Sequence, residues 1–225
     1  MKKAVCLISG GLDSAVTSFI AKDQGYEIYG LSFCYGQRHN KELEYAKKIG
    51  RILGVKDHVF FNLDIDVFKS SSLVDRSKNI QMDVDIKDIG KDIPVTYVPG
   101  RNTVFLSIGL AYAETVDAEA VFIGVTSTDY SGYPDCRPEF IKSFQKMANI
   151  CNKKGVEGNP IKIVTPLLYL NKSEIIKKGI SLEVPFEYTW SCYLGEDLAC
   201  GRCDSCQLRL KGFKNANLKD PLNYR

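Results

Sequence analysis

The chain has 225 residues, of which 44% are hydrophobic and 25% charged, and 30 Lys and Arg against 27 Asp and Glu give a formal net charge of +3. These values are typical of one globular α/β domain with a small appendage, and they exclude long disorder. The charge is too small to indicate a nucleic-acid partner, and the longest mainly apolar run, residues 104–113, is too short to span a membrane.

Short apolar runs alternate with helical patterns along most of the chain. We expect strands over residues 3–8, 27–35, 57–63, 120–125 and 161–164. We expect helices over residues 15–24, 42–53, about 14 residues after position 102, 137–152 and 172–178. Because strands that alternate with helices form βαβ units, the sequence predicts an α/β fold with a doubly wound, mainly parallel five-stranded sheet.

Two regions break this alternation. Residues 64–97 are polar, charged and without periodicity, which is typical of either a mobile lid or a surface excursion. From Trp190 onward the chain has a cysteine-rich knuckle, a basic helix and a tail. We therefore expect a main domain over residues 1–189, which includes the 64–97 insert, and a small metal-binding region over residues 190–225 packed on the same domain.

The hexapeptide SGGLDS, residues 9–14, stands between the first predicted strand and the first predicted helix. The adjacent Gly10 and Gly11 let the backbone approach a ligand closely, and a helix N-terminus offers unpaired N–H groups to a phosphate. Ser9 and Ser14 add hydroxyl donors. Neither G-x-x-x-x-G-K-[ST] nor G-x-G-x-x-G is present, so the loop is not that of a P-loop NTPase or a dinucleotide-binding enzyme. The structural alternative is an ordinary strand–turn–helix.

This hexapeptide resembles the SGGxDS pyrophosphate loop of the N-type ATP pyrophosphatases, which share an adenine nucleotide alpha hydrolase-like fold. The resemblance implies that a substrate is adenylated by ATP, that pyrophosphate leaves, and that a nucleophile then displaces AMP. It implies that Asp13 also caps or orients the loop. The nucleotide-binding residues that it implies are Ile8, Ser9, Gly10, Gly11, Leu12, Asp13, Ser14, Ala15, Val16, Thr17 and Ser18.

The N-terminus and the cysteine content predict the compartment. The apolar run over residues 4–8 ends after five residues and Asp13 follows, so there is no signal-peptide hydrophobic region and we expect a cytoplasmic protein. The eight cysteines are then expected to be thiols or metal ligands rather than disulfides. The cysteines expected to pack inside predicted strands or a helix are Cys6, Cys34 and Cys151.

Four cysteines near the C-terminus have the spacing C-x7-C-x2-C-x2-C: Cys192, Cys200, Cys203 and Cys206. All-cysteine sites of this kind are typically structural zinc sites, in which four protein ligands leave no position for water. The alternatives are buried hydrophobic cysteines, disulfides and an iron–sulfur cluster, but Leu210 stands where a ferredoxin has its fourth cysteine. We expect one structural Zn²⁺ per chain that folds residues 190–208 against the active site.

Four further segments carry polar residues where a parallel sheet builds its sites. Three follow predicted strands and one precedes a helix: residues 35–39 (YGQRH), 129–137 (DYSGYPDCR), 165–167 (TPL) and 98–102 (VPGRN). Together with the SGGLDS loop and the four-cysteine spacing, YGQRH, VPGRN and DYSGYPDCR closely resemble the family of 7-cyano-7-deazaguanine synthases. This resemblance implies that 7-carboxy-7-deazaguanine, ammonia and ATP become 7-cyano-7-deazaguanine (preQ0), AMP and pyrophosphate, in queuosine biosynthesis.

The implied reaction needs a carboxylate to be activated twice at one ATP site. Adenylation makes the carboxylate an acyl donor, and ammonia then gives an amide. The amide becomes a nitrile only when its oxygen also leaves, so a second adenylation is the simplest route. Mg²⁺ is expected to bridge the phosphates. Two histidines and 225 residues leave no room for a glutaminase domain, so we expect ammonia that is free or supplied by a partner.

The residue types and the resemblance together assign catalytic and substrate-binding roles to residues of these segments and to Lys172. The expected catalytic residues are Arg101, Asp129 and Lys172. The expected substrate-binding residues are Tyr35, Gln37, Arg38, Tyr130, Tyr133 and Arg137. The roles of His39 and Cys136 stay open.

Each of these assignments has a structural alternative. Arg101 would contact phosphate or the substrate carboxylate, or else form a surface ion pair. Asp129 would accept hydrogen bonds from the guanine-like edge, or else cap a turn. Lys172 would neutralise phosphate, or else be solvated at the start of its helix. The rings of Tyr130 and Tyr133 would stack on the flat base, or else belong to the core.

Two other functions fit the same fold. A tRNA-modifying enzyme would need a basic face, which the sequence lacks beyond a few basic residues near its C-terminus. A nucleotide-sensing interaction module with a zinc ribbon would bind nucleotide without releasing AMP. The family resemblance further implies a homodimer, and Leu208, Leu210 and Phe213 on the C-terminal helix are the candidate interface.

Overall fold

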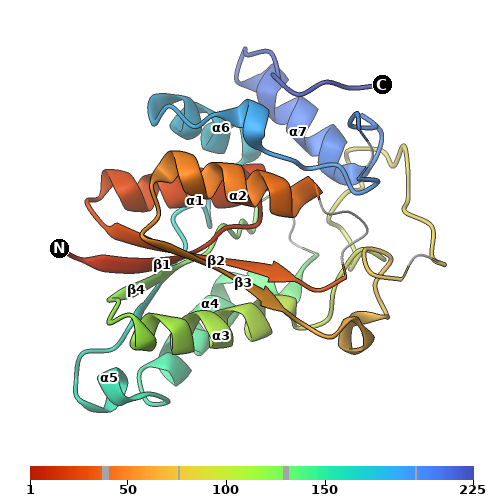
Figure 1. Cartoon of the computed structure of the whole chain (residues 1–225). Coiled ribbons are helices and arrows are strands. Elements are labelled where there is room, and N and C mark those ends of the chain that lie inside the picture. The colour runs from red at the N-terminus through yellow and green to blue at the C-terminus, as the bar shows by residue number, and fades with distance from the viewer. Residues whose placement is uncertain (37–40, 76, 129–131, 196) are drawn as a thin grey trace.

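The computed structural model describes residues 1–36, 41–75, 77–128, 132–195 and 197–225 (Figure 1). Its five strands form one parallel sheet in the order β3-β2-β1-β4-β5, which confirms the expected fold class. The strands are β1 (Lys3–Leu7), β2 (Glu27–Cys34), β3 (Asp57–Asn62), β4 (Ala120–Phe122) and β5 (Lys162–Val164).

Helices cover both faces of the sheet, because the buried parallel strands carry apolar side chains on each face. The helices are α1 (Leu12–Asp23), α2 (Lys41–Leu53), α3 (Arg101–Thr115), α4 (Pro138–Ala148), α5 (Lys153–Val156), α6 (Lys172–Ser181) and α7 (Asp204–Asn215). Figure 1 shows α1, α2, α6 and α7 on one side of the sheet and α3, α4 and α5 on the other. Two apolar clusters, one on each side, form the core.

Several predicted boundaries are wrong by up to four residues; the last predicted helix, for example, ends at Ser181 instead of residue 178. Three of these differences have local reasons. The first helix begins at Leu12 instead of residue 15, so half of the SGGLDS loop is its first turn. Strand β4 ends at Phe122 instead of residue 125, next to the point where Gly124 passes against the backbone of Asp13. The expected helix over residues 137–152 stops at Ala148, because Asn152 caps a separate turn of helix, α5.

The insert over residues 64–97 has little regular structure in its described part, as the sequence predicts, apart from a 3-10 helix at Ile65–Phe68. Phe68 and Val74 anchor it in the apolar core, and it is also attached to the cysteine knuckle. Met82 pairs with Cys203 in an isolated antiparallel bridge, and the side chains of Asp83 and Arg202 form an ion pair. These contacts favour the surface excursion over a detached lid.

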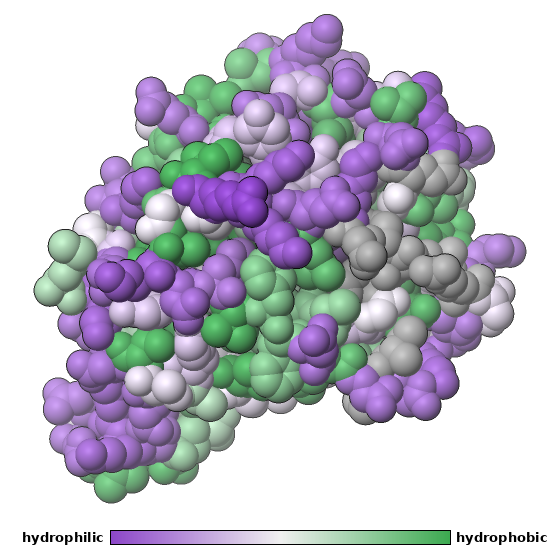
Figure 2. All heavy atoms as spheres, in the orientation of Figure 1, coloured by the Kyte–Doolittle hydropathy of each residue, from purple (hydrophilic) through white to green (hydrophobic). Residues whose placement is uncertain are grey.

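The surface is of mixed character. Figure 2 shows hydrophilic and hydrophobic residues side by side over one face of the molecule. The most exposed large apolar side chains after Met1 are those of Val156, Ile150 and Tyr169. Within the described ranges, no helix combines the length and the apolar character that crossing a membrane requires.

Candidate active site

A cavity of about 260 Å³ opens at the carboxyl edge of the sheet. One part of its wall is polar and combines the SGGLDS loop with side chains from the C-terminal third of the chain, among them Lys172, Ser191 and Arg209. The other part is apolar and aromatic and includes Phe33 and Phe105. The site is therefore suited to a ligand with both a phosphate chain and flat rings.

The SGGLDS loop is held in shape by its own hydrogen bonds and by a neighbouring helix. The Ser9 hydroxyl donates to Ser14 Oγ at 2.9 Å and accepts from the Gly11 N–H at 3.2 Å. Gly10 has φ of +84°, and a Cβ there would lie 2.1 Å from the carbonyl oxygen of Glu42 in α2. Only glycine fits this contact, so the loop packs directly on the backbone of the first turns of α2.

The expected nucleotide-binding residues fall into two groups. Those that line the cavity are Ile8, Ser9, Gly11, Leu12, Asp13 and Ser14. Those that are buried in the body of α1 and do not line it are Ala15, Val16, Thr17 and Ser18. Gly10 lies behind the loop, against α2. The structure thus brings the first group together around the cavity and leaves the second group in supporting positions.

Asp13 and Lys172 form a partly buried ion pair on the cavity wall. Lys172 Nζ donates to both carboxylate oxygens of Asp13, at 2.8 and 2.7 Å, although 159 residues separate the two in the chain. A capping box between Asn171 and Glu174 fixes the start of α6. Of the alternatives left open by the sequence, two are wrong: Lys172 is buried rather than solvated, and no side chain caps α1, so Asp13 does not act as a cap.

Arg101 stands at the aromatic part of the cavity. Its Nη1 donates to the Tyr35 hydroxyl at 3.3 Å, and its guanidinium lies within 6 Å of the ring centroids of Tyr35 and Phe105. Among the described residues it forms no ion pair, so the alternative of a surface ion pair is wrong. Its charge therefore remains available to an anionic group of a ligand in the cavity.

The segments VPGRN and DYSGYPDCR contact one another where α3 begins. The Asn102 N–H donates to Asp135 Oδ2 at 2.9 Å, and the Asn102 amide donates to the Asp135 carbonyl and to Cys136 Sγ. This contact fixes the direction in which the neighbouring Arg101 leaves α3. Burial raises the pKa of Cys136 to about 12, so this thiol stays neutral and is a poor nucleophile.

Tyr133 also lines the cavity, as expected of a residue that contacts a flat base. Its hydroxyl pairs with Thr96 Oγ1 of the insert at 3.0 Å, and its ring stacks on Tyr97 with centroids 5.9 Å apart. Burial raises the pKa of the Tyr133 hydroxyl, which stays neutral. The ring therefore joins the insert to the cavity wall.

Of the other expected site residues, the structure describes Arg137 alone. Arg137 is exposed at the start of α4 and is not part of the cavity wall. The expected site residues that lie outside the described part of the chain are Gln37, Arg38, Asp129 and Tyr130. His39 lies outside it as well. Cys6 is buried as expected and Cys34 is half-buried, whereas Cys151 is exposed, so the expectation that it packs is wrong.

Among the described residues of the cavity wall, two charged ones are not singled out as site residues by any pattern in the sequence. Glu42 is half-buried in the first turn of α2, where burial raises the pKa of its carboxyl to about 7 and the charge of Arg101 partly offsets this. Arg209 on α7 is 1% exposed and forms a buried ion pair with Asp220. Both reach the cavity through tertiary contacts, which spacing along the chain does not reveal.

Removal of the Asp220 carboxylate by Asp220→Ala is expected to lower the free energy of unfolding by about 3–5 kcal/mol, because the Arg209 guanidinium is left as a buried unpaired charge. Denaturant unfolding measures this value. The matched control is Asp88→Ala, which removes an ion pair with Lys91 whose Asp side chain is 58% exposed. The control is expected to cost no more than about 1 kcal/mol. Equal losses of unfolding free energy in the two variants would contradict the conclusion that the buried pair of Arg209 and Asp220 stabilises the fold.

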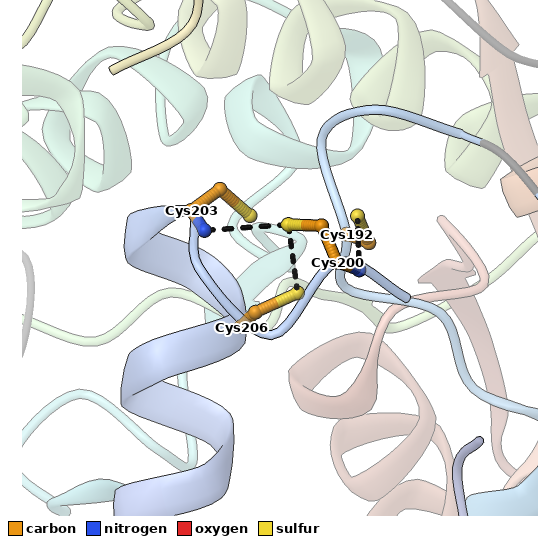
Figure 3. A group of neighbouring side chains, drawn as sticks. All are labelled: Cys192, Cys200, Cys203 and Cys206. Atoms are coloured by element: carbon orange, nitrogen blue, oxygen red, sulfur yellow. Dashed lines mark hydrogen bonds between the residues drawn. The ribbon is translucent and has the colours of Figure 1, made fainter. Parts of the chain in front are cut away.

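The four cysteines of the C-terminal spacing converge as predicted (Figure 3). Their Sγ atoms lie within 4.8 Å of one another and all four residues are buried, with Cys203 and Cys206 at the start of α7 and Cys192 and Cys200 in the preceding loop. A tetrahedral metal with metal–sulfur bonds of about 2.3 Å holds its sulfurs about 3.8 Å apart, and the sulfurs of Cys200 and Cys206 are 3.9 Å apart. The cluster thus fits a metal ion.

The cysteine cluster is next to the cavity. Trp190 and Tyr193, which flank Cys192 closely in sequence, line the cavity wall. The Trp190 ring stacks on Tyr45 of α2 with centroids 6.0 Å apart, and the backbone N–H of Trp190 donates to the Gly10 carbonyl at 2.8 Å. The conformation of the knuckle therefore determines which side chain packs against one side of the phosphate loop.

Comparison with known proteins assigns the family. A family model described as "Queuosine biosynthesis protein QueC" matches residues 3–217. The chain belongs to the QueC family. It is 53% identical to the 7-cyano-7-deazaguanine synthase of Citrifermentans bemidjiense, covering 100% of this chain and 98% of that protein. It is 52% identical to the protein of that name from Coxiella burnetii strain RSA 331, again covering 100% and 98%.

Structural comparison supports the fold of this QueC family member. The NMN synthetase of Francisella tularensis superposes with a TM-score of 0.51 at 15% identity, covering 97% of this chain and 78% of that one. At this identity the likeness shows the fold alone. Membership of the QueC family favours the synthase over the two other functions considered from the sequence, a tRNA-modifying enzyme and a nucleotide-sensing module.

Proposed function

We propose that this chain converts 7-carboxy-7-deazaguanine and ammonia into 7-cyano-7-deazaguanine, with ATP split into AMP and pyrophosphate. The proposal rests mainly on one observation. A preformed phosphate loop and an aromatic wall that carries Arg101 face the same cavity. The relatives that match the chain over its whole length have the corresponding name.

The residues around the cavity divide the work of the first adenylation. The N–H groups and hydroxyls of the SGGLDS loop bind the β- and γ-phosphates. Lys172, which Asp13 holds in place, stabilises the charge that develops on the phosphoryl oxygens. Arg101 orients the substrate carboxylate toward the α-phosphorus, and the rings of Tyr35, Phe105 and Tyr133 hold the flat base. Mg²⁺, when bound, would supply further charge neutralisation on the phosphates, and the Asp13 carboxylate of the loop would hold it.

The reaction then proceeds in two rounds at this one site. A carboxylate oxygen attacks the α-phosphorus and pyrophosphate leaves, and ammonia displaces AMP to give the amide. The amide oxygen attacks the α-phosphorus of a second ATP. Loss of AMP with both remaining nitrogen protons leaves the nitrile. Because both rounds need the same phosphate contacts, a single loop is sufficient.

An assay with purified protein, ATP, Mg²⁺, 7-carboxy-7-deazaguanine and ¹⁵N-labelled ammonium tests the proposal. Mass spectrometry is expected to find the ¹⁵N-nitrile, and nucleotide chromatography is expected to find AMP and no ADP. Release of AMP only in the presence of another acid or of RNA would show that 7-carboxy-7-deazaguanine is not the substrate. ADP in place of AMP would overturn the reaction class.

We also propose that the metal of the cysteine cluster is structural zinc. Four thiolates in a buried tetrahedral cluster suit Zn²⁺, and they leave no open position for catalysis. The ion would hold residues 190–208 in the conformation that places Trp190 and Tyr193 on the cavity wall. We further propose that residues 1–189 form the nucleotide-binding unit and residues 190–225 the zinc-bearing one.

Substitution of one ligand by Cys203→Ser is expected to abolish stoichiometric zinc binding and to lower the thermal midpoint of unfolding, because structural zinc contributes on the order of 10 kcal/mol to folding. Elemental analysis and calorimetry measure the two effects. Cys151→Ser is the control, since that thiol is exposed and outside the cluster. Iron with acid-labile sulfide in the wild-type protein would contradict zinc.

Association into a homodimer is a further proposal, which rests on the resemblance to the family. The interface suggested by the sequence needs correction: Leu208 and Phe213 are buried inside the chain, because α7 packs on α6, and only Leu210 of the three is exposed. An interface on α7 would therefore use a different face. Sedimentation equilibrium tests the dimer, and a monomer at assay concentrations would refute it.

A further inference from the structure

Glu42 is a cavity carboxyl that the steps above do not use. Of the described residues on the cavity wall, the acidic ones are Asp13 and Glu42. Asp13 is held by two hydrogen bonds from Lys172. Glu42 takes part in none of the ion pairs among the described residues, and the nearby charge of Arg101 acts on it without a direct ion pair.

The position of Glu42 is fixed by the phosphate loop itself. Gly10 approaches the backbone of α2 so closely that a Cβ there would lie 2.1 Å from the Glu42 carbonyl and 2.9 Å from the Ala46 nitrogen. Figure 1 shows α2 beginning at the end of the molecule to which β2 points. Glu42 is therefore placed by a helix that packs directly on the phosphate loop, and its side chain lines the same cavity as that loop.

The proposed reaction needs a group in the cavity that accepts a proton from the nitrogen donor. Ammonia, like the amine of lysine, is mostly protonated at neutral pH and must lose a proton before it attacks. The raised pKa of Glu42 suits an exchange of protons near neutral pH. The other acidic group of the described wall, Asp13, is already committed to Lys172.

We propose, on the basis of the proposed function, that Glu42 is the general base that deprotonates the nitrogen donor. Ammonium gives one proton to the Glu42 carboxylate, and the resulting ammonia attacks the acyl carbon of the adenylate. The C–N bond forms, the C–O bond to AMP breaks, and AMP leaves with the bonding electron pair. The extra proton on the attached nitrogen passes to solvent, which leaves the neutral amide.

The test separates adenylation from attack by nitrogen in the variant Glu42→Gln. Exchange of labelled pyrophosphate into ATP, measured with 7-carboxy-7-deazaguanine and without ammonium, reports adenylation alone. Amide and nitrile formation at saturating ammonium reports the nitrogen step. Hydroxylamine, a weaker base that is largely neutral at pH 7, reports attack by a nucleophile that does not need deprotonation first. Glu44→Gln, on an exposed residue of the same helix, is the control.

We expect Glu42→Gln to keep pyrophosphate exchange and hydroxamate formation near the wild-type rates and to lose about 100-fold or more in ammonia-dependent kcat. Glu42→Asp is expected to recover part of that loss, and Glu44→Gln to change none of the three rates. Ammonia-dependent turnover of Glu42→Gln near the wild-type rate would overturn the inference, as would an equal loss in exchange. Absence of exchange in the wild type would instead overturn the proposed function.

Discussion

Substitution of Gly10 by alanine is expected to lower substrate-dependent pyrophosphate exchange by about 100-fold or more, because a displacement of about 1 Å at a reacting group has effects of this size. The new Cβ would lie 2.1 Å from the Glu42 carbonyl oxygen, a backbone atom that no rotamer change can move aside. Either the phosphate loop or the first turn of α2 must shift. The exchange assay measures the loss directly.

The control for this substitution is Gly25→Ala, after the end of α1. Gly25 has φ of +79°, close to the +84° of Gly10, but a Cβ there would meet nothing within 4 Å. Gly25→Ala therefore shares the backbone strain, about 1–2 kcal/mol in the free energy of unfolding, without the collision. Exchange by Gly25→Ala is expected to stay unchanged. Equal exchange rates in the two variants would show that the loop tolerates the shift.

Substitution of Lys172 by glutamine is expected to lower kcat by about 100- to 1,000-fold, the usual result of losing one preorganised group that stabilises transition-state charge. The variant removes the positive charge and also leaves the Asp13 carboxylate, 26% exposed, facing the phosphates. Steady-state release of AMP measures kcat, and calorimetry checks that the variant folds.

Lys177→Gln is the matched control, because Lys177 lies on the same helix and is exposed. It is expected to keep the wild-type kcat. A second comparison uses Asp13→Asn together with Lys172→Gln, which removes both members of the pair. If Lys172 acted only by neutralising Asp13, this double variant would recover the wild-type kcat, which would contradict a direct role on phosphate.

Features carried by short stretches of sequence are predicted well in this chain. The SGGLDS loop combines strand, glycine pair and helix start within a few residues, and the structure places it at the carboxyl edge of the sheet. The four cysteines lie within a single short segment, so their convergence follows from spacing. Arg101 and Tyr133 reach the cavity because VPGRN and DYSGYPDCR contact each other at the start of α3.

Contacts between distant segments were not predictable in the same way. Lys172 and Asp13 are far apart in the chain, and only the packing of α6 beside α1 brings them together. Glu42 faces the cavity because Gly10 packs on the backbone of α2, a contact with no signature in sequence spacing. The sequence predicts only a basic helix for the segment of α7, yet Arg209 on it is buried and pairs with Asp220.

The most direct test of adenylation is to trace the two carboxylate oxygens of the substrate into the products. With 7-carboxy-7-deazaguanine labelled by ¹⁸O at both carboxylate oxygens, mass spectrometry of the products locates each label. Two adenylations predict one ¹⁸O in each of two AMP molecules for every nitrile formed, and none in pyrophosphate. Unlabelled AMP, with ¹⁸O in pyrophosphate, phosphate or water, would contradict activation of the substrate at the α-phosphorus.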